Sequence, residues 1–222
     1  MLRRAERPGC DDQRAERPGR AGPAPGAEAG MTVAATRPAS AAAAVWPLAG
    51  HGHACLRPLR SGDGPAEQRF FNGLSLDSRH QRFHIGLREL SPMLLALLTN
   101  VDGTWHRAWV LEQPTSAGPR ILADARYVRD PAEPARAEFA LAVADDWQGR
   151  GLGRRLIAHL IDEARGQGVN ELFGEVLAEN RRMLALAREF GMRVRAHPES
   201  GALVRVSWHP TLAVPIQDSR RS

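Results

Sequence analysis

The 222-residue sequence contains no lysine, and all 30 of its strongly basic side chains are arginines. The protein therefore has no side-chain amine of its own that could be acetylated or ubiquitinated. It has two cysteines, Cys10 and Cys55, which are too few for a disulfide framework and favour a reducing, cytoplasmic location. It also has no run of about 18 apolar residues, which argues against a membrane-spanning helix.

The composition is that of a chain able to form one packed domain, since 43% of its residues are apolar and 25% are charged. The formal net charge is +5. Seven arginines and five acids fall in residues 1–52, and 23 arginines and 20 acids follow. So small an excess is a weak basis for binding a phosphate backbone, and we expect neither a nucleic-acid nor a membrane partner.

The first 52 residues differ in composition from the rest. They repeat Arg-Ala-Glu-Arg-Pro-Gly at 4–9 and 14–19 and continue with runs of Ala, Pro and Gly. Such a segment buries too little apolar surface to offset the entropy of ordering it, so we expect a disordered extension over 1–52. One domain over 53–210 and a short tail over 211–222 would follow. Whether translation starts at Met1 or at Met31 stays open.

Apolar periodicity predicts a mixed α/β layout. Alternating patterns predict strands at 54–59, 105–112, 120–129, 137–143, 171–177, 193–196 and 202–208. Helical spacing, with serine or proline at helix starts and glycine at helix ends, predicts helices at 65–72, 74–83, 93–99, 151–166 and 180–190. The early strands form antiparallel pairs, and a β-α-β-α unit ends the domain.

The most informative stretch is 138–153, where a predicted strand runs through a glycine-rich loop into the strongest helix. The first turn of a helix has unpaired N–H groups and a partial positive charge, and it therefore accepts a phosphate readily. Gly149, Gly151 and Gly153 allow a phosphate to approach the backbone, and Arg150 and Arg154 add cationic donors. The stretch predicts a phosphate-binding loop.

Two common phosphate loops do not match this sequence. A P-loop requires a lysine, and the chain has none. A dinucleotide fingerprint requires glycine at 154 or 156, where Arg154 and Leu156 stand. What remains is a Gln-x-x-Gly-x-Gly pattern made by Gln148, Gly151 and Gly153.

In its strand–loop–helix context this pattern resembles the acyl-coenzyme A signature of the GNAT superfamily of N-acetyltransferases. A second segment, 175–180 followed by Phe190-Gly191-Met192, resembles the other segment typical of that superfamily. The resemblance spans 53–208 and implies a GNAT fold: a central mixed, mostly antiparallel sheet of six to seven strands, flanked by helices. It also implies acetyl-coenzyme A (acetyl-CoA) as the cosubstrate.

The resemblance further implies which residues bind the cofactor. The backbone of the strand before the loop would pair with the pantetheine amides, the loop amides would hold the diphosphate, and Asn180 would contact the pantetheine arm unless it serves only as a helix N-cap. The implied set is Leu141, Val143, Gln148, Gly149, Arg150, Gly151, Leu152, Gly153, Arg154 and Asn180.

A narrower resemblance is to the acetyltransferase domain of Pat-type protein lysine acetyltransferases. It is carried by the segments 57–60, 73–79, 82–83, 90–93 and 137–140. Those enzymes attach this domain to a synthetase-like portion or a nucleotide-sensing domain. The sequence shows neither, so how activity would be regulated stays open. His80 stands where that group often has tyrosine.

An amine attacks a thioester only when it is neutral, and a lysine amine with a pKa of about 10.4 is almost fully charged at pH 7. A general base is therefore expected, and Glu138 is the candidate, since strand alternation sends it to the face opposite Phe139, Leu141 and Val143. The resemblance agrees, because Pat-type enzymes use a glutamate at this strand position. A solvated surface glutamate is the alternative.

Two further expectations concern the reaction. A backbone N–H near Val143 would stabilise the charge that develops on the thioester oxygen. GNAT enzymes often have a tyrosine near the end of the last helix to meet the leaving thiolate, but Ala187 stands there and the only tyrosine is Tyr127. We therefore expect no tyrosine general acid and direct transfer in a ternary complex. Cys55 is expected to be a small buried side chain.

The remaining polar residues indicate no further chemistry. The eight histidines have no metal-ligand spacing, so no metal is expected. Asp145 and Asp146 are expected to shape the turn before the loop. The acceptor is a primary amine, most simply a protein lysine. A small-molecule amine or aminoglycoside, and a non-catalytic sensor of acetyl-CoA, stay open as alternatives, as does the choice between monomer and homodimer.

Overall fold

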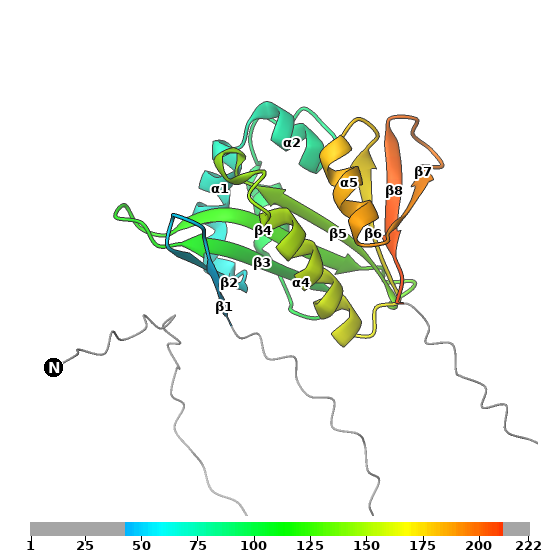
Figure 1. The fold of residues 1–222 in the computed structure, drawn as a ribbon, viewed down its shortest axis with the longest axis horizontal. Helices are drawn as coiled ribbons and strands as arrows, with labels where there is room; N and C mark the ends of the chain where they lie inside the picture. The colour runs from blue at the N-terminus through cyan, green and yellow to red at the C-terminus, as the bar shows by residue number, and fades with distance from the viewer. Residues whose placement is uncertain (1–42, 211–222) are drawn as a thin grey trace, which may run out of the picture.

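The computed structural model describes residues 43–210, and their strands form one sheet in the order β1-β2-β3-β4-β5-β6-β8-β7 (Figure 1). All neighbours are antiparallel except β5 and β6, which run parallel. The strands are β1 (Ala44–Pro47), β2 (His53–Pro58), β3 (His106–Gln113), β4 (Arg120–Arg129), β5 (Arg136–Val143), β6 (Glu171–Leu177), β7 (Arg193–Ala196) and β8 (Leu203–Trp208).

Five α-helices flank this sheet in the described range: α1 (Gly64–Gly73), α2 (Leu76–Phe83), α3 (Pro92–Thr99), α4 (Leu152–Gly166) and α5 (Arg181–Glu189). Short 3₁₀ turns occupy Ser61–Asp63 and Asp145–Trp147. Ser75 and Ser91 cap α2 and α3 by accepting hydrogen bonds from the backbone N–H groups of Ser78 and Leu94.

The helices form a layer on each side of the sheet. α1 packs against β4, and α2 against β5, on one side. α4 packs on the other side and buries a stripe of Leu152, Leu156, Ile157, Leu160, Ile161 and Ala164, the residues whose helical spacing predicted it. In Figure 1, α4 and α5 lie on the viewer's side of the sheet.

β5 and β6 pair along only part of their length. Arg136, Ala137 and Glu138 pair with residues 171–173, and beyond Glu138 the two strands separate. β5 then continues to Val143 beside β4 alone, and β6 continues beside β8 alone. The facing backbone edges past this point have no strand partner, so the sheet opens in the middle.

The architecture confirms the expected α/β fold with a mixed, mostly antiparallel sheet between helices. The described sheet has eight strands, more than the six to seven expected. The additional strand is β1, which lies inside the segment expected to be disordered and pairs with β2. The expected boundary at residue 53 is therefore wrong, since the sheet begins at Ala44; residues 1–42 and the tail from 211 lie outside the described range.

The reason for this error is local. Trp46 and Leu48 are almost the only large apolar residues in a run of Ala, Pro and Gly, but both are buried. The guanidinium of Arg155 lies 4.0 Å from the centre of the Trp46 ring. Composition gave little sign of this strand, because what orders it is the edge of β2 and a helix more than 100 residues later in the chain.

Candidate active site

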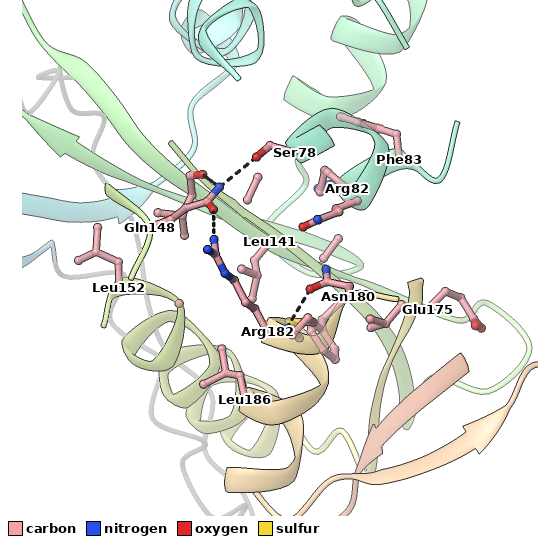
Figure 2. A pocket seen from close by; sticks show the side chains of 18 of the residues that line it. Ser78, Arg82, Phe83, Leu141, Gln148, Leu152, Glu175, Asn180, Arg182 and Leu186 are labelled. Atoms are coloured by element: carbon pink, nitrogen blue, oxygen red, sulfur yellow. Dashed lines mark hydrogen bonds between the residues drawn. The ribbon is translucent and has the colours of Figure 1, made fainter. Parts of the chain in front are cut away.

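A cavity of about 400 Å³ occupies the opening between β5 and β6 (Figure 2). Its walls come from α2, from β5 and the loop after it, from the first turn of α4, from β6 and from α5. Of the residues expected to form the site, those that line the cavity are Glu138, Leu141, Val143, Gln148, Gly149, Leu152, Gly153 and Asn180. Glu138 and Asn180, which are 42 positions apart in the sequence, thus line the same cavity.

Glu138 and Glu175 face this cavity from the two separating strands. Partial burial, and after it the negative charge of Glu175, raise the pKa of Glu138. The guanidiniums of Arg82, Arg205 and Arg136 act in the opposite direction. Glu138 thus lies beside three cations in a partly desolvated position, although its side chain is still reached by solvent.

Glu175 is held in place by ion pairs from the far side of β6. Its Oε1 accepts hydrogen bonds from Nε and Nη2 of Arg205, over 2.8 and 2.6 Å. Its Oε2 lies 3.6 Å from Nε2 of His197. The charge of Glu175 is therefore largely compensated, whereas Glu138 makes no ion pair within the described chain.

Arg82 of α2 separates the cavity from a buried polar cluster beneath it. Burial lowers the pKa of Arg82 to about 10, so its guanidinium is still charged at neutral pH. Beneath it, Arg126 bonds to Glu67 over 3.0 Å and also to Asp124, and all three side chains are almost fully buried. Arg82, which Figure 2 shows at the cavity, also lines a small hollow together with these three residues.

Two glycines of the loop before α4 have backbone angles that other residues rarely adopt. Gly149 and Gly151 have φ angles of 72° and 80°, in the left-handed region that side chains disfavour. Gly153 has no such backbone angle, and a Cβ there would lie 3.4 Å from Cδ2 of Leu186, an ordinary contact distance that shows how near α5 lies to the start of α4. The N–H groups of Leu152 and Gly153, in the first turn of α4, have no intrahelical partner and border the cavity.

The side chain of Gln148 ties the loop to its surroundings (Figure 2). Its Nε2 donates to the carbonyl oxygen of Val143 over 3.1 Å and to the hydroxyl of Ser78 over 3.0 Å. Its Oε1 accepts from Nη1 of Arg182 over 3.1 Å. The Ser78 hydroxyl in turn donates to Asp145, 2.7 Å away. One glutamine thereby joins α2, β5, the loop and α5.

Sequence reasoning missed Ser78, Arg82, Glu175 and Arg182 as members of this site. Asp145 was expected to shape the turn, and it does so while also accepting from the backbone N–H and hydroxyl of Ser75. The spacing of two serines at the start of α2 was the available signal. Nothing in the sequence marked their partner, which lies about 70 residues away.

The remaining expected cofactor-binding residues lie at the edge of the site. Oδ1 of Asn180 accepts from the N–H of Met183 over 3.0 Å, which confirms its N-cap role, and the residue also lines the cavity. Gly151, Arg150 and Arg154 do not line it. The Arg150 guanidinium lies over Trp147 and contacts His51, and Arg154 pairs with Glu189.

The other residues considered from sequence lie away from the cavity. Tyr127 is fully buried and packs against Trp109, with ring centres 5.9 Å apart, and Ala187 is also fully buried. Cys55 is buried, as expected. Among residues 43–210, no three His, Cys, Asp or Glu side chains are grouped so as to hold a metal ion. No helix in this range is long and apolar enough to cross a bilayer.

Known proteins with similar sequences are acetyltransferases. Residues 96–192 match the acetyltransferase (GNAT) family. The chain is 35% identical over 152 residues to acetyltransferase PA5475 of Pseudomonas aeruginosa, an alignment that covers 68% of this chain and 81% of that protein. It is 36% identical over 139 residues to acetyltransferase Pat of Mycolicibacterium smegmatis, covering 61% of this chain and 40% of Pat.

Among solved structures, the GNAT domain of S. lividans PAT superposes with a TM-score of 0.68 at 27% identity, covering 78% of this chain and 99% of that domain. The chain therefore belongs to the GNAT family of acetyltransferases.

Proposed function

We propose that this protein transfers the acetyl group of acetyl-CoA to a primary amine, that of a protein lysine, by direct attack in a ternary complex. The observation that carries the proposal is the cavity where β5 and β6 separate. It has a carboxylate, Glu138, on one side and the glycine loop before α4 on the other.

The donor would lie along the open edge of β5. Beyond Glu138 this edge of β5 has no strand partner, so the backbone of Leu141 and the N–H of Val143 are available to the amides of a pantetheine arm, while the Val143 carbonyl accepts from Gln148. The N–H groups from Gln148 to Gly153 would bind the diphosphate at the start of α4. Arg150 and Arg154, on the outer side of this loop, would add positive charge.

The acceptor amine would enter beside Glu138. Keeping a lysine amine neutral at pH 7 costs roughly 4 to 5 kcal/mol, and a base at the amine recovers part of this. Glu138 would accept the proton, directly or through a water molecule. Because its pKa is raised, it is a better base than a free glutamate.

The bond changes are those of acyl transfer. The amine nitrogen bonds to the thioester carbon, and the C–S bond breaks. Negative charge passes through the carbonyl oxygen, near a backbone N–H of Val143, and ends on the sulfur. A thiol with a pKa of about 8.5 can leave as thiolate or take the proton released by the amine. No tyrosine is assigned to this step, since Tyr127 lies elsewhere.

Two observations favour a lysine over an aminoglycoside as the acceptor. The Pat-type resemblance is one. The other is charge: Arg205 compensates Glu175, so Glu138 is the carboxylate that faces the cavity without an ion pair in the described chain. One free carboxylate suits a single ammonium group better than a polycation, which several carboxylates would recognise.

The test is thiol release from acetyl-CoA with lysine peptides, polyamines and aminoglycosides as acceptors. Glu138→Gln is expected to lower turnover by about 10²–10⁴-fold with the Kd of acetyl-CoA unchanged. The control is Glu133→Gln, at an exposed position in the loop before β5 and outside the cavity, which is expected to retain turnover. Unchanged turnover in Glu138→Gln would refute the base. If the protein binds acetyl-CoA but releases no thiol with any of these acceptors, it is a sensor and not an enzyme.

A further inference from the structure

The side of the sheet that carries Glu138 continues past the cavity. Residues paired directly across neighbouring strands point to the same side of a sheet. Glu138 pairs with Phe173, Phe173 with Ser207, and Ser207 with Arg193. These four side chains therefore form one row that runs from the proposed base across β6 and β8 to β7.

A second row on the same side joins Glu175, Arg205 and Arg195. The helices on this side, α1 and α2, pack against β4 and β5, while the opposite side of β7 and β8 buries Val194 and Val206 in the core. We call the uncovered side of β6, β8 and β7 the arginine face; its members are Glu171, Phe173, Glu175, Arg193, Arg195, Arg205, Ser207 and His209.

The acids of the arginine face already have partners. Glu171 forms an ion pair with Arg136, with 3.2 Å between Oε2 and Nε, and Glu175 accepts a hydrogen bond from Arg205 over 2.6 Å. Phe173 lies under both guanidiniums, whose carbons are 4.3 and 4.9 Å from the ring centre. Around Phe173, the two carboxylates and the two guanidiniums therefore neutralise one another.

Two of its cations are not compensated. Arg193 and Arg195 are exposed, and their guanidiniums make no hydrogen bond or ion pair with any described residue. Together with Arg205, His209 and Glu171, whose carboxylate pairs with Arg136, they line a hollow of about 340 Å³. Glu138, at the cavity next to this face, makes no ion pair with a described residue, and two guanidiniums without an ion pair lie on the outer strand, β7.

We propose that the arginine face binds an acidic segment of the acceptor protein, so that the enzyme selects lysines with aspartate or glutamate a few residues away. This rests on the proposed function. Neighbouring strands are about 4.8 Å apart, which puts Arg193 about 14 Å from Glu138 and corresponds to about four residues of an extended peptide. Guanidinium groups bind carboxylates in paired, charge-assisted hydrogen bonds, so the charge pattern of the face is complementary to such a segment.

The test compares two lysine peptides that differ only at the third and fourth residues from the lysine, on both sides: glutamate in one, glutamine in the other. For the full chain at low salt, the KM of the acidic peptide is expected to be about tenfold or more below that of the neutral peptide. In Arg193→Gln/Arg195→Gln that preference should disappear with kcat unchanged, and Arg193→Glu/Arg195→Glu should reverse it. Salt should weaken it.

The control variant is Arg165→Gln/Arg188→Gln, which removes the same charge from α4 and α5 on the other side of the sheet. It should still prefer the acidic peptide. Equal KM values for both peptides in the wild type, or a preference that survives in Arg193→Gln/Arg195→Gln, would overturn this inference and leave the proposed function standing. If the wild type acetylates neither peptide but does acetylate a polyamine, the lysine acceptor fails and this inference fails with it.

Discussion

The ring of Phe139 lies against Gly174 at the point where β5 and β6 separate. The last pair between β5 and β6 is Glu138 with Phe173; Phe139 and Gly174 are the next residues of the two strands. A Cβ on Gly174 would lie 3.0 Å from Cε1 of Phe139 and 3.2 Å from its carbonyl oxygen. The ring therefore occupies the space that a side chain would need, and it marks the apex of the cavity.

Gly174→Ala is consequently expected to disturb the opening of the sheet. Its methyl group would meet both a ring and a backbone atom, and forced overpacking of this kind costs about 1–3 kcal/mol. We expect a lower free energy of unfolding in urea, together with weaker acetyl-CoA binding by calorimetry. Gly166→Ala, whose added Cβ meets nothing within 4 Å, is the control. An unchanged stability in Gly174→Ala would show that the ring moves aside freely.

The pH at which kcat/KM falls on the acid side should depend on the charged residues around Glu138. Burial and Glu175 raise the pKa of Glu138, while Arg205 lowers it. Since the base must be ionised, Glu175→Gln is expected to move the acid limb of kcat/KM to lower pH, and Arg205→Met to higher pH. Shifts in the same direction for both variants, or none, would contradict the assignment of Glu138 as the base.

The buried cluster under Arg82 should respond asymmetrically to substitution. Burial and the adjacent Asp124 raise the pKa of Glu67, so a neutral glutamine can replace it, and Glu67→Gln should not destabilise the protein at pH 7. Arg126→Met would leave Asp124 buried without its cation, a change that costs about 3–5 kcal/mol. Denaturant unfolding of the two variants measures this difference. Equal losses would mean that Glu67 is ionised in the native state.

The sign of the Glu67 effect can also be followed with pH. A carboxyl whose pKa is raised by folding contributes stability at low pH and loses it as pH rises towards the folded pKa. Glu67→Gln should therefore gain stability relative to wild type as the pH is raised. If Glu67→Gln instead gained stability relative to wild type as the pH was lowered, the pKa of Glu67 would be lowered by folding and not raised.

His159 provides a stability effect of opposite sign. Burial, with an edge-on contact to Trp109 at 4.9 Å, lowers the pKa of His159 to about 4, below the unfolded value of 6.5. Its contribution is complete above pH 6.5 and is lost as the pH falls towards 4, which amounts to about 2 kcal/mol at pH 5. His159→Phe, which lacks this titration, should gain about 2 kcal/mol of stability relative to wild type when the pH is lowered from 7 to 5. A stability difference independent of pH would contradict this.

The fold and the loop could largely be predicted because their signals are local. The stripe of α4 and the alternation of β4 repeat within a few residues, and the glycines of the loop stand close to one another in the sequence. What could not be predicted depends on distant partners. β1 is ordered by the edge of β2, and Arg182 reaches the site only because Gln148 lies across the cavity.

Calorimetric titration of acetyl-CoA and acetyl-pantetheine tests the central claim, that the loop before α4 binds the diphosphate of the donor. We expect one site in the wild type, with acetyl-CoA bound more tightly than acetyl-pantetheine, which lacks the diphosphate. In Gly151→Val a β-branched residue would have to adopt a φ of 80°, and this advantage should disappear while the affinity for acetyl-pantetheine is kept. No binding of acetyl-CoA to the wild type, or an undiminished advantage in the variant, would contradict the account.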